Sequence, residues 1–199
     1  MSIYKLKSQF QSFLRPITQG VAKIGITANQ ITIFAMLLSC LVGVILYTNT
    51  FIGLVLLPIF LFIRMALNAI DGMLAREHNM QSKLGAILNE IGDVISDTAL
   101  YLPFAWITGF STVLIVIIVL LSVISEMMGV IAVQIGASRR YDGPMGKSDR
   151  AFMFGLLSLL LVVGALPENW IFTILVVVTM LLILTIINRA QNALKECKQ

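Results

Sequence analysis

The sequence predicts an all-α protein, a polytopic membrane bundle of six transmembrane helices with an N-terminal amphipathic surface helix. Hydrophobic residues make up 58% of the 199 residues and charged residues only 12%, where soluble domains carry roughly 25% charged residues. The mean hydropathy of +0.95 indicates the same membrane class. Six apolar segments of helical length alternate with polar stretches, which is typical of a helical membrane protein.

The first 20 residues form the expected amphipathic helix, with apolar side chains on one helical face and basic or polar ones elsewhere. The apolar face consists of Ile3, Leu6, Phe10, Phe13, Leu14 and Ile17. This segment is too polar to span a bilayer, and its basic excess suits anionic headgroups, so we expect it to lie on the membrane surface. A helix that packs only on its own protein would show the same stripe and stays an alternative.

The six-helix bundle is expected over residues 30–192, as part of one domain that comprises residues 1–199. The first span runs roughly from Gln30 to Tyr47, and Thr27 or Asn29 can cap it by accepting backbone N–H bonds. The remaining spans are expected near residues 51–76, 84–108, 112–137, 151–166 and 170–188.

The placement of positive charge predicts the orientation. Lys and Arg gather in the N-terminal segment, in the polar stretches after spans two and four, and in the C-terminal tail, whereas the opposite turns contain none. By the positive-inside rule both termini are cytoplasmic, which requires an even number of spans. We expect a multi-pass protein of the cell membrane, in bacteria the inner membrane, surrounded by lipid and without a nucleic-acid partner.

Polar residues recur on helical spacing between residues 68 and 97, inside otherwise apolar sequence. One helical face carries Asn68, Asp71 and Ala75, flanked by Gly72 and Arg76. The next helix carries Gly85, Asn89, Asp93 and Asp97, which step by four. The polar turn between the two helices is short, so we expect an antiparallel pair with both polar faces toward each other, forming the site.

The pattern D-G-x2-A-R-x8-G-x3-N-x3-D resembles the signature of the CDP-alcohol phosphatidyltransferases, an integral membrane family. The matching positions are Asp71, Gly72, Ala75, Arg76, Gly85 and Asp93, at the family's spacing. The first and third aspartates of the family pattern are Asn68 and Asn89 here. The resemblance is sharpest over residues 68–93, and its six-helix plan extends to most of the chain.

This resemblance implies transfer of a phosphatidyl group from CDP-diacylglycerol to an alcohol acceptor, with release of CMP. It assigns the CDP moiety to Asp71, Gly72, Ala75, Arg76 and Gly85, with Arg76 on the pyrophosphate. It makes Asp93, the last aspartate of the motif, the general base. We also expect a homodimer. The acceptor is not visible in the sequence, because the shape of the pocket selects it.

Such a transfer needs a divalent cation, Mg²⁺ or Mn²⁺, on the pyrophosphate. The expected ligands are Asn68, Asp71, Asn89 and Asp93, whose carboxylate and amide oxygens suit these ions. Two formal negative charges are missing relative to the family pattern. We therefore expect weaker metal binding or the loss of a second ion, unless Glu90 or Asp97 compensates.

Each of four further charged residues has two alternative roles. Lys147 and Arg150, in the polar loop before the fifth span, either hold a phosphate on the acceptor or are ordinary cytoplasmic-loop cations. Arg64 and Glu126, inside spans, are expected to pair within the bundle or to help hold a polar substrate.

Alternatives to the site and to its function remain. Gly72, Ala75 and Gly85 fit a close-packed helix interface equally well, and Arg76 fits an anchor at the membrane interface. A rival function within the family uses a CDP-headgroup donor with diacylglycerol as the acceptor. A rival of another class is a non-catalytic member or small transporter that binds lipid or ions, which the two asparagines favour.

Overall fold

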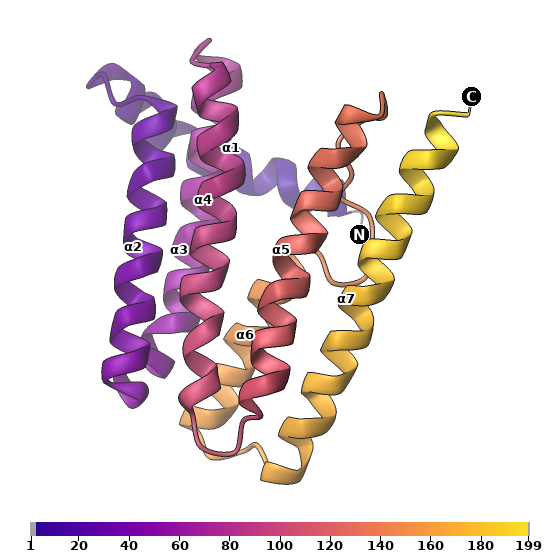
Figure 1. Ribbon diagram of the computed structural model, residues 1–199. Helices are drawn as coiled ribbons and strands as arrows, with labels where there is room; N and C mark the ends of the chain where they lie inside the picture. The colour runs from indigo at the N-terminus through magenta and orange to yellow at the C-terminus, as the bar shows by residue number, and fades with distance from the viewer. Residues whose placement is uncertain (1–2, 199) are drawn as a thin grey trace.

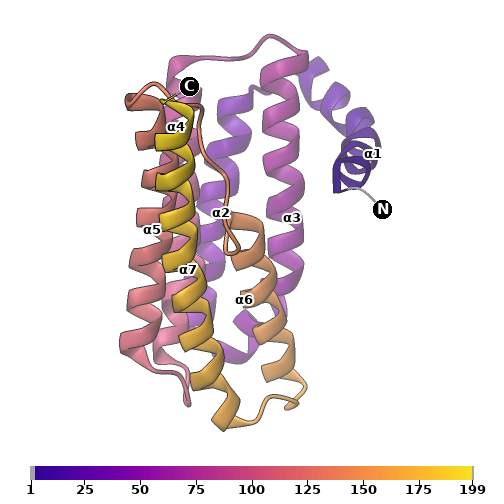
Figure 2. The ribbon, with the colours of Figure 1, turned by 90° about the vertical axis from the view of Figure 1, so that its right-hand side faces the viewer.

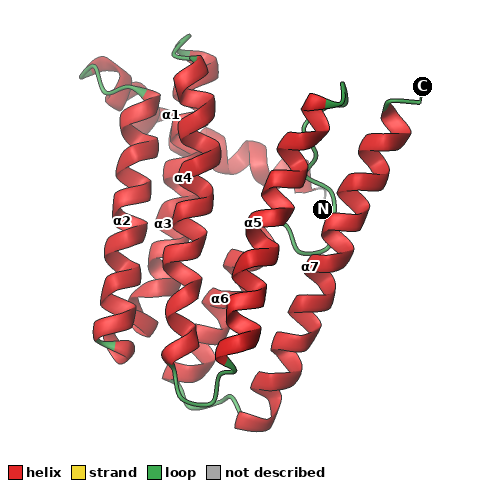
Figure 3. Cartoon of the chain, viewed as in Figure 1, coloured by secondary structure: helices red, strands yellow, loops and turns green. Residues whose placement is uncertain are grey.

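The computed structural model describes residues 3–198. Within that range there are seven α-helices and one short 3₁₀ helix, and no strand, which confirms the all-α prediction (Figures 1 and 3). The helices are α1 (Ile3–Lys23), α2 (Ala28–Thr48), α3 (Thr50–Glu77), α4 (Lys83–Tyr101), η1 (Leu102–Trp106), α5 (Thr112–Gln134), α6 (Lys147–Val162) and α7 (Glu168–Glu196). The ends of the expected domain at residues 1 and 199, and the side chains of Ile3 and Leu6, lie outside the described part of the chain.

Helices α2 to α7 stand side by side, and α1 lies across them near one end, on the outer side of α3 (Figures 1 and 2). α2 packs against α3 and α4, α3 against α6, and α5 against α7. Leu14 and Thr18 of α1 are buried against α3, whereas Phe13 and Ile17 are exposed. The apolar stripe of α1 is thus divided between a protein-facing side and an uncovered side.

Four of the described helices are long and apolar enough to cross a membrane, namely α2, α3, α5 and α7. The sequence predicts six spans, and the other two correspond to α4 and α6. α4 carries Glu90, Asp93 and Asp97 along its length, and α6 has only 16 residues. Both helices nevertheless lie in the bundle beside the four apolar ones (Figure 1).

Local interactions explain where α2 begins and where α4 ends. Thr27 caps α2, because its hydroxyl accepts from Gln30 N at 3.3 Å while the Gln30 side chain accepts from Thr27 N at 2.8 Å. The third expected span is shorter than the sequence suggests. α4 ends at Tyr101, and a 3₁₀ helix with Pro103 in its first turn follows.

The start of α6 differs from the expectation in a way that matters for the site. The helix begins at Lys147, four residues earlier than expected, because the Asp149 side chain accepts from Gly146 N at 2.9 Å and stabilises the first turn. Lys147 and Arg150 therefore belong to the first turn of a helix, and the expectation that they lie in a loop is wrong.

The loop of residues 135–146 descends from the end of α5 into the bundle, so that α6 begins part-way along α7 (Figure 2). Thr185 of α7 holds this loop, since its hydroxyl accepts from Met145 N at 2.9 Å. Gly143 has a φ of +114°, and a Cβ there would lie 2.6 Å from Thr185 Cγ2, so only glycine fits. The descent places the first turn of α6 at the depth of Asp93.

The apolar core fills the end of the bundle opposite the α3–α4 turn. Its centre is aromatic, with the rings of Tyr101 and Phe154 stacked at a centroid distance of 4.1 Å and 7° from parallel. Leu57 and Leu175 are fully buried in the same cluster. The polar residues lie nearer the other end, where α3 turns into α4.

Candidate active site

Asp71 lies on the inward side of α3 and is 6% exposed. Its Oδ2 accepts a hydrogen bond from Thr32 Oγ1 of α2 at 2.9 Å. A buried carboxylate needs such a donor, because burial of an unpaired charge is costly. Thr32 lies outside the motif and within an apolar stretch, so nothing in the sequence marks it as a residue of the site.

A pocket of about 370 Å³ opens between α2, α3 and α4 beside Asp71, and we call it the motif pocket. It is lined by all five residues that the sequence assigns to the CDP moiety, namely Asp71, Gly72, Ala75, Arg76 and Gly85. The rest of its wall includes Asn29, Thr32, Ser82, Asn89 and Glu90. The antiparallel α3–α4 pair thus brings the two halves of the motif to one cavity.

At two glycines of the motif pocket, polar side chains lie close against the backbone. A Cβ at Gly85 would lie 2.7 Å from Asn29 Oδ1, and a Cβ at Gly72 would lie 3.1 Å from the Arg76 guanidinium. Arg76 itself is exposed, and within the described residues no salt bridge holds it, in contrast to Arg64 and Arg150. The Arg76 guanidinium is therefore free to bind an anion in the pocket.

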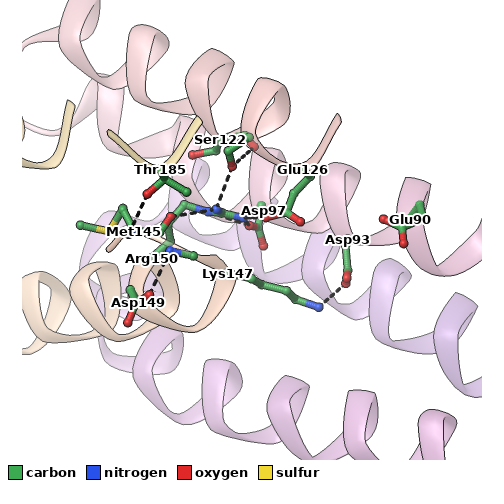
Figure 4. Close-up of polar contacts among 12 residues, drawn as sticks. Glu90, Asp93, Asp97, Ser122, Glu126, Met145, Lys147, Asp149, Arg150 and Thr185 are labelled. Atoms are coloured by element: carbon green, nitrogen blue, oxygen red, sulfur yellow. Dashed lines mark hydrogen bonds and ion pairs between the residues drawn. The ribbon is translucent and has the colours of Figure 1, made fainter. Parts of the chain in front are cut away.

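Asp93 lies outside the motif pocket and faces α3 and α6. Lys147, in the first turn of α6, forms an ion pair with Asp93 Oδ1 (Figure 4). Arg64 of α3 places Nη2 3.6 Å from the same carboxylate oxygen and 3.4 Å from the Asp93 carbonyl oxygen. The carboxylate of Asp93 is thus held in place by cations from two neighbouring helices.

A network of buried and half-buried charges on both sides of Asp93 joins α3, α4, α5, the α5–α6 loop, α6 and α7, and we call it the arginine network. It contains Arg64, Arg139, Arg150 and Arg189 together with Glu90, Asp97 and Glu126. Asp97 accepts from Arg64 Nη1 at 2.6 Å and from Arg150 Nη2 at 2.8 Å. Figure 4 shows Arg150 directed at Asp97 from α6.

The arginine network corrects two expectations. Arg64 pairs with Asp97 and not with Glu126, because Arg64 faces α4 whereas Glu126 faces α6 and α7. Arg150 is fully buried between Asp97 and Glu126, so it does not present a free cation to a ligand. Lys147 is likewise occupied by Asp93.

Arg139 and Arg189 are members of the network that the sequence did not single out. In the sequence, both residues contribute only to the positive charge that predicts the cytoplasmic side. Arg189 is 1% exposed, although it stands at the start of the polar C-terminal part of α7, beside Asn188. Its sequence context is that of a tail cation, so only the structure shows that it is buried.

The loop that carries Arg139 is held by the end of α7. Ser138 donates to Glu196 through its backbone N–H and its hydroxyl, both at 2.9 Å. Arg140 bridges Glu196 at 2.6 Å and Asp142 at 2.7 Å. The hydrogen bond from Arg140 keeps the pKa of the Asp142 carboxyl below its ordinary value.

A second cavity of about 460 Å³ lies between α3 and α6, and we call it the α3–α6 groove. Its long wall is apolar and includes Leu61, Phe62, Ala151, Phe152 and Leu156. Its polar end is formed by Arg64, Asn68, Lys147 and Ser148. The side chains that touch Asp93 therefore also close the polar end of this groove.

The structure does not bring the four expected metal ligands to one cavity. Asp71 and Asn89 line the motif pocket, Asn68 lines the α3–α6 groove, and Asp93 lines neither. Within residues 3–198 no three Asp, Glu, His or Cys side chains gather as a metal cluster. Mg²⁺ usually binds through one or two carboxylates together with substrate phosphates. The donor set fits one hard cation that shares a substrate's phosphates, with Asp71 and Asn89 as the ligands on the pocket wall.

Comparison with known proteins identifies a family and several relatives that this chain resembles. The model of the CDP-alcohol phosphatidyltransferase family matches residues 25–182. Inner membrane protein YnbA of Escherichia coli (strain K12) is 46% identical over 195 residues, which cover 98% of this chain and 97% of that protein. Archaetidylinositol phosphate synthase of Pyrococcus horikoshii is 32% identical over 101 residues, about half of each chain (51% and 52%).

Two crystal structures of the phosphatidylinositol phosphate synthase PgsA1 of Mycobacterium tuberculosis share the fold. The structure with CDP-DAG bound has a TM-score of 0.74 and 19% identity, covering 89% of this chain and 92% of that one. The structure with manganese and citrate has the same score and identity, covering 90% of this chain and 88% of that one. At this identity the likeness establishes the arrangement of helices.

The arginine network predicts a stability effect. Asp97→Ala leaves Arg64 and Arg150 buried without the carboxylate between them, which should cost about 3–5 kcal/mol of unfolding free energy. Thermal unfolding of the detergent-solubilised protein measures the change. Glu77→Gln is the control, because Glu77 pairs with Arg15 across side chains that are 38% and 48% exposed, where the effect should be small. Equal shifts for both variants would contradict a structural role for the network.

Proposed function

This chain belongs to the CDP-alcohol phosphatidyltransferase family, and we propose that it transfers a phosphatidyl group from CDP-diacylglycerol to an alcohol acceptor. The observation that carries this proposal is the motif pocket, where Asp71, Gly72, Ala75, Arg76 and Gly85 meet. CMP is the second product. The whole chain acts as one catalytic domain.

The CDP moiety binds in the motif pocket. Arg76 is exposed at its rim and free of a salt bridge within the described residues, so its guanidinium binds the pyrophosphate. Gly72 lets the Arg76 guanidinium lie against the helix, and Gly85 does the same for the Asn29 side chain, so both polar groups stay on the pocket wall to meet the nucleotide. A related synthase, PgsA1, has been crystallised with CDP-DAG bound, which supports this choice of donor.

The acyl chains of the donor lie in the α3–α6 groove. This groove is apolar along most of its length and polar where Asn68 and Lys147 close it. A lipid likewise has a charged head at one end and apolar tails along the rest of its length, so its polarity matches that of the groove. Phe62 and Phe152 on the groove wall are exposed, so the groove is open toward the surrounding lipid.

Asp93 serves as the general base. The acceptor's hydroxyl oxygen forms a bond to the phosphorus that carries diacylglycerol, while the bond from this phosphorus to the bridging oxygen breaks. CMP leaves with the bridging oxygen, and the hydroxyl proton passes to the Asp93 carboxylate. Lys147 and Arg64 pair with this carboxylate and orient it.

A divalent ion, Mg²⁺ or Mn²⁺, binds with Asp71 and Asn89 on the pocket wall, and Asn68 and Asp93 are the outlying positions of the expected set. Bound there, it would neutralise the pyrophosphate oxygens and so help CMP to leave. A structure of PgsA1 contains manganese, which supports a metal of this class.

In the membrane, α2 to α7 form six spans, with the polar residues of α4 and α6 turned into the bundle. α1 lies on the surface through exposed Phe13 and Ile17. Both termini and the site face the cytoplasm, because the Lys and Arg clusters share that side. The E. coli relative is named an inner membrane protein, which agrees with this location. A homodimer stays a prediction, which cross-linking in the membrane tests.

A non-catalytic, lipid-binding role is the second candidate. It is favoured by the two asparagines of the motif and by the ion pair that Lys147 forms with Asp93. The deciding experiment is CMP release from CDP-diacylglycerol by the purified protein with Mg²⁺ or Mn²⁺. A protein that binds the donor but releases no CMP with any alcohol would support this role.

Asp93→Asn should lower the rate of CMP release by about 10²–10⁴-fold, because the amide keeps the shape of the side chain but cannot take the hydroxyl proton. Binding of CDP-diacylglycerol should be unchanged. Arg76→Ala provides the contrast, since it should weaken donor binding and leave the fold intact. Undiminished CMP release by Asp93→Asn would remove Asp93 from the mechanism.

Asn89→Asp should lower the Mn²⁺ concentration that gives half-maximal binding and activity, because it adds a carboxylate to the pocket wall that Asp71 shares. Asn68→Asp is the matched control. Its new carboxylate would lie beside Lys147 and Arg64 in the groove, so it should change Mn²⁺ binding less. Electron paramagnetic resonance of free Mn²⁺ measures binding without turnover. Unchanged Mn²⁺ binding by Asn89→Asp would exclude Asn89 as a ligand.

Thr50→Cys tests the orientation. Thr50 is the exposed first residue of α3, at the end of the bundle away from Cys197. In intact cells an impermeant thiol reagent should label the introduced cysteine and spare Cys197. Labelling of Cys197 in the parent protein would reverse the proposed topology.

A further inference from the structure

Glu126 is the point at which three arginines from three different elements converge. Arg150 of α6 lies 3.0 Å from its Oε1, Arg189 of α7 lies 3.5 Å from the same oxygen, and Arg139 of the α5–α6 loop lies 3.5 Å from Oε2. Guanidinium groups gathered from several elements around one point are the usual protein site for a phosphate. In this chain a carboxylate of the protein occupies that point.

The cluster around Glu126 is closed. Arg150 and Arg189 are 0% and 1% exposed, and Glu126 is 8% exposed. The cavity beside Glu126 has a volume of about 10 Å³, which is room for one water molecule. The negative charge of Glu126 holds the three guanidinium groups together, so the cluster stays closed to a phosphate group while that charge is present.

The neighbouring cations are also neutralised by carboxylates. Lys147 pairs with Asp93, and Arg139 pairs with Glu90 as well as with Glu126. A phosphate on the acceptor would meet four arginines that already face three carboxylates of the protein, and it would be repelled by Glu126 and Asp93. An acceptor without a phosphate needs no free arginine, and it has no phosphate charge for these carboxylates to repel.

We propose that Glu126 occupies the anion site of the acceptor subsite, so that this chain transfers the phosphatidyl group to an alcohol that carries no phosphate. This inference rests on the proposed function and narrows its substrate class. It also separates the chain from relatives named as synthases of phosphatidylinositol phosphate and archaetidylinositol phosphate, whose products carry a phosphate by name. Glu126 acts here as a specificity-determining residue and takes no part in the chemical step.

The test begins with the parent protein in detergent or vesicles, with CDP-diacylglycerol and Mn²⁺. The first acceptor group consists of glycerol, myo-inositol and serine, and the second of sn-glycerol 3-phosphate and myo-inositol 1-phosphate. CMP release and the lipid product are measured for each, and donor binding is measured separately. We expect products with members of the first group and none with the second.

Glu126→Gln then tests the residue itself. The amide keeps the size of the side chain and removes its charge, so that the three arginines are left to attract an external anion. We expect sn-glycerol 3-phosphate to become an acceptor, or inorganic phosphate to inhibit about tenfold more strongly, the factor of one hydrogen bond to a charged group. Asp149→Asn is the matched control. It removes a carboxylate from the same turn of α6 as Arg150, but Asp149 is exposed and contacts no arginine of the network.

The outcomes separate the two proposals. A parent protein that binds no CDP-diacylglycerol contradicts the proposed function. One that binds the donor but releases CMP with no alcohol in either group also contradicts the proposed function. One that releases CMP with the phosphorylated acceptors overturns the specificity inference alone. A folded Glu126→Gln protein with the same response to phosphate as the parent overturns the role of Glu126. If that variant does not fold, the acceptor screen of the parent protein still tests the specificity inference, because products with phosphorylated acceptors contradict it.

Discussion

Four arginines enter the interior of an apolar helical bundle, and each of them must meet a carboxylate there, because an isolated buried charge is too costly to keep. Asp97 of α4 and Glu126 of α5 are the two carboxylates that hold most of this charge, and both are deeply buried. Their partners come from α3, α6, α7 and the α5–α6 loop. Charge compensation therefore determines how these elements can be arranged around α4 and α5.

The descending loop before α6 follows from the same constraint. If α6 began at the end of the bundle, Lys147 and Arg150 would not reach the depth of Asp93 and Asp97. Because the loop is held at Thr185 and at Glu196, the first turn of α6 meets both aspartates. The result is a division of the site into a motif pocket on one side of Asp93 and an apolar groove on the other.

This arrangement gives the two halves of the proposed CDP-lipid donor different surroundings. Within the described residues, the motif pocket offers Arg76, an exposed guanidinium that no salt bridge holds. The groove offers an apolar wall with exposed side chains. Asp93 lines neither cavity and is held by Lys147 and Arg64, which form part of the polar end of the groove. Asn68 and Asn89 stand where the family pattern has aspartates, so the two cavities carry two fewer negative charges than that pattern would give.

The sequence by itself determined the all-α class and the pairing of the two motif helices. Helical periodicity is a local property, so the spacing from Asn68 to Asp93 sufficed to predict that Asp71, Arg76 and Gly85 would share a site. Only the tertiary structure decided the partner of each buried charge. Arg64 meets Asp97 and not Glu126, and Arg150 is enclosed instead of free, because long-range packing and the path of the α5–α6 loop set those contacts. No spacing along the chain encodes them.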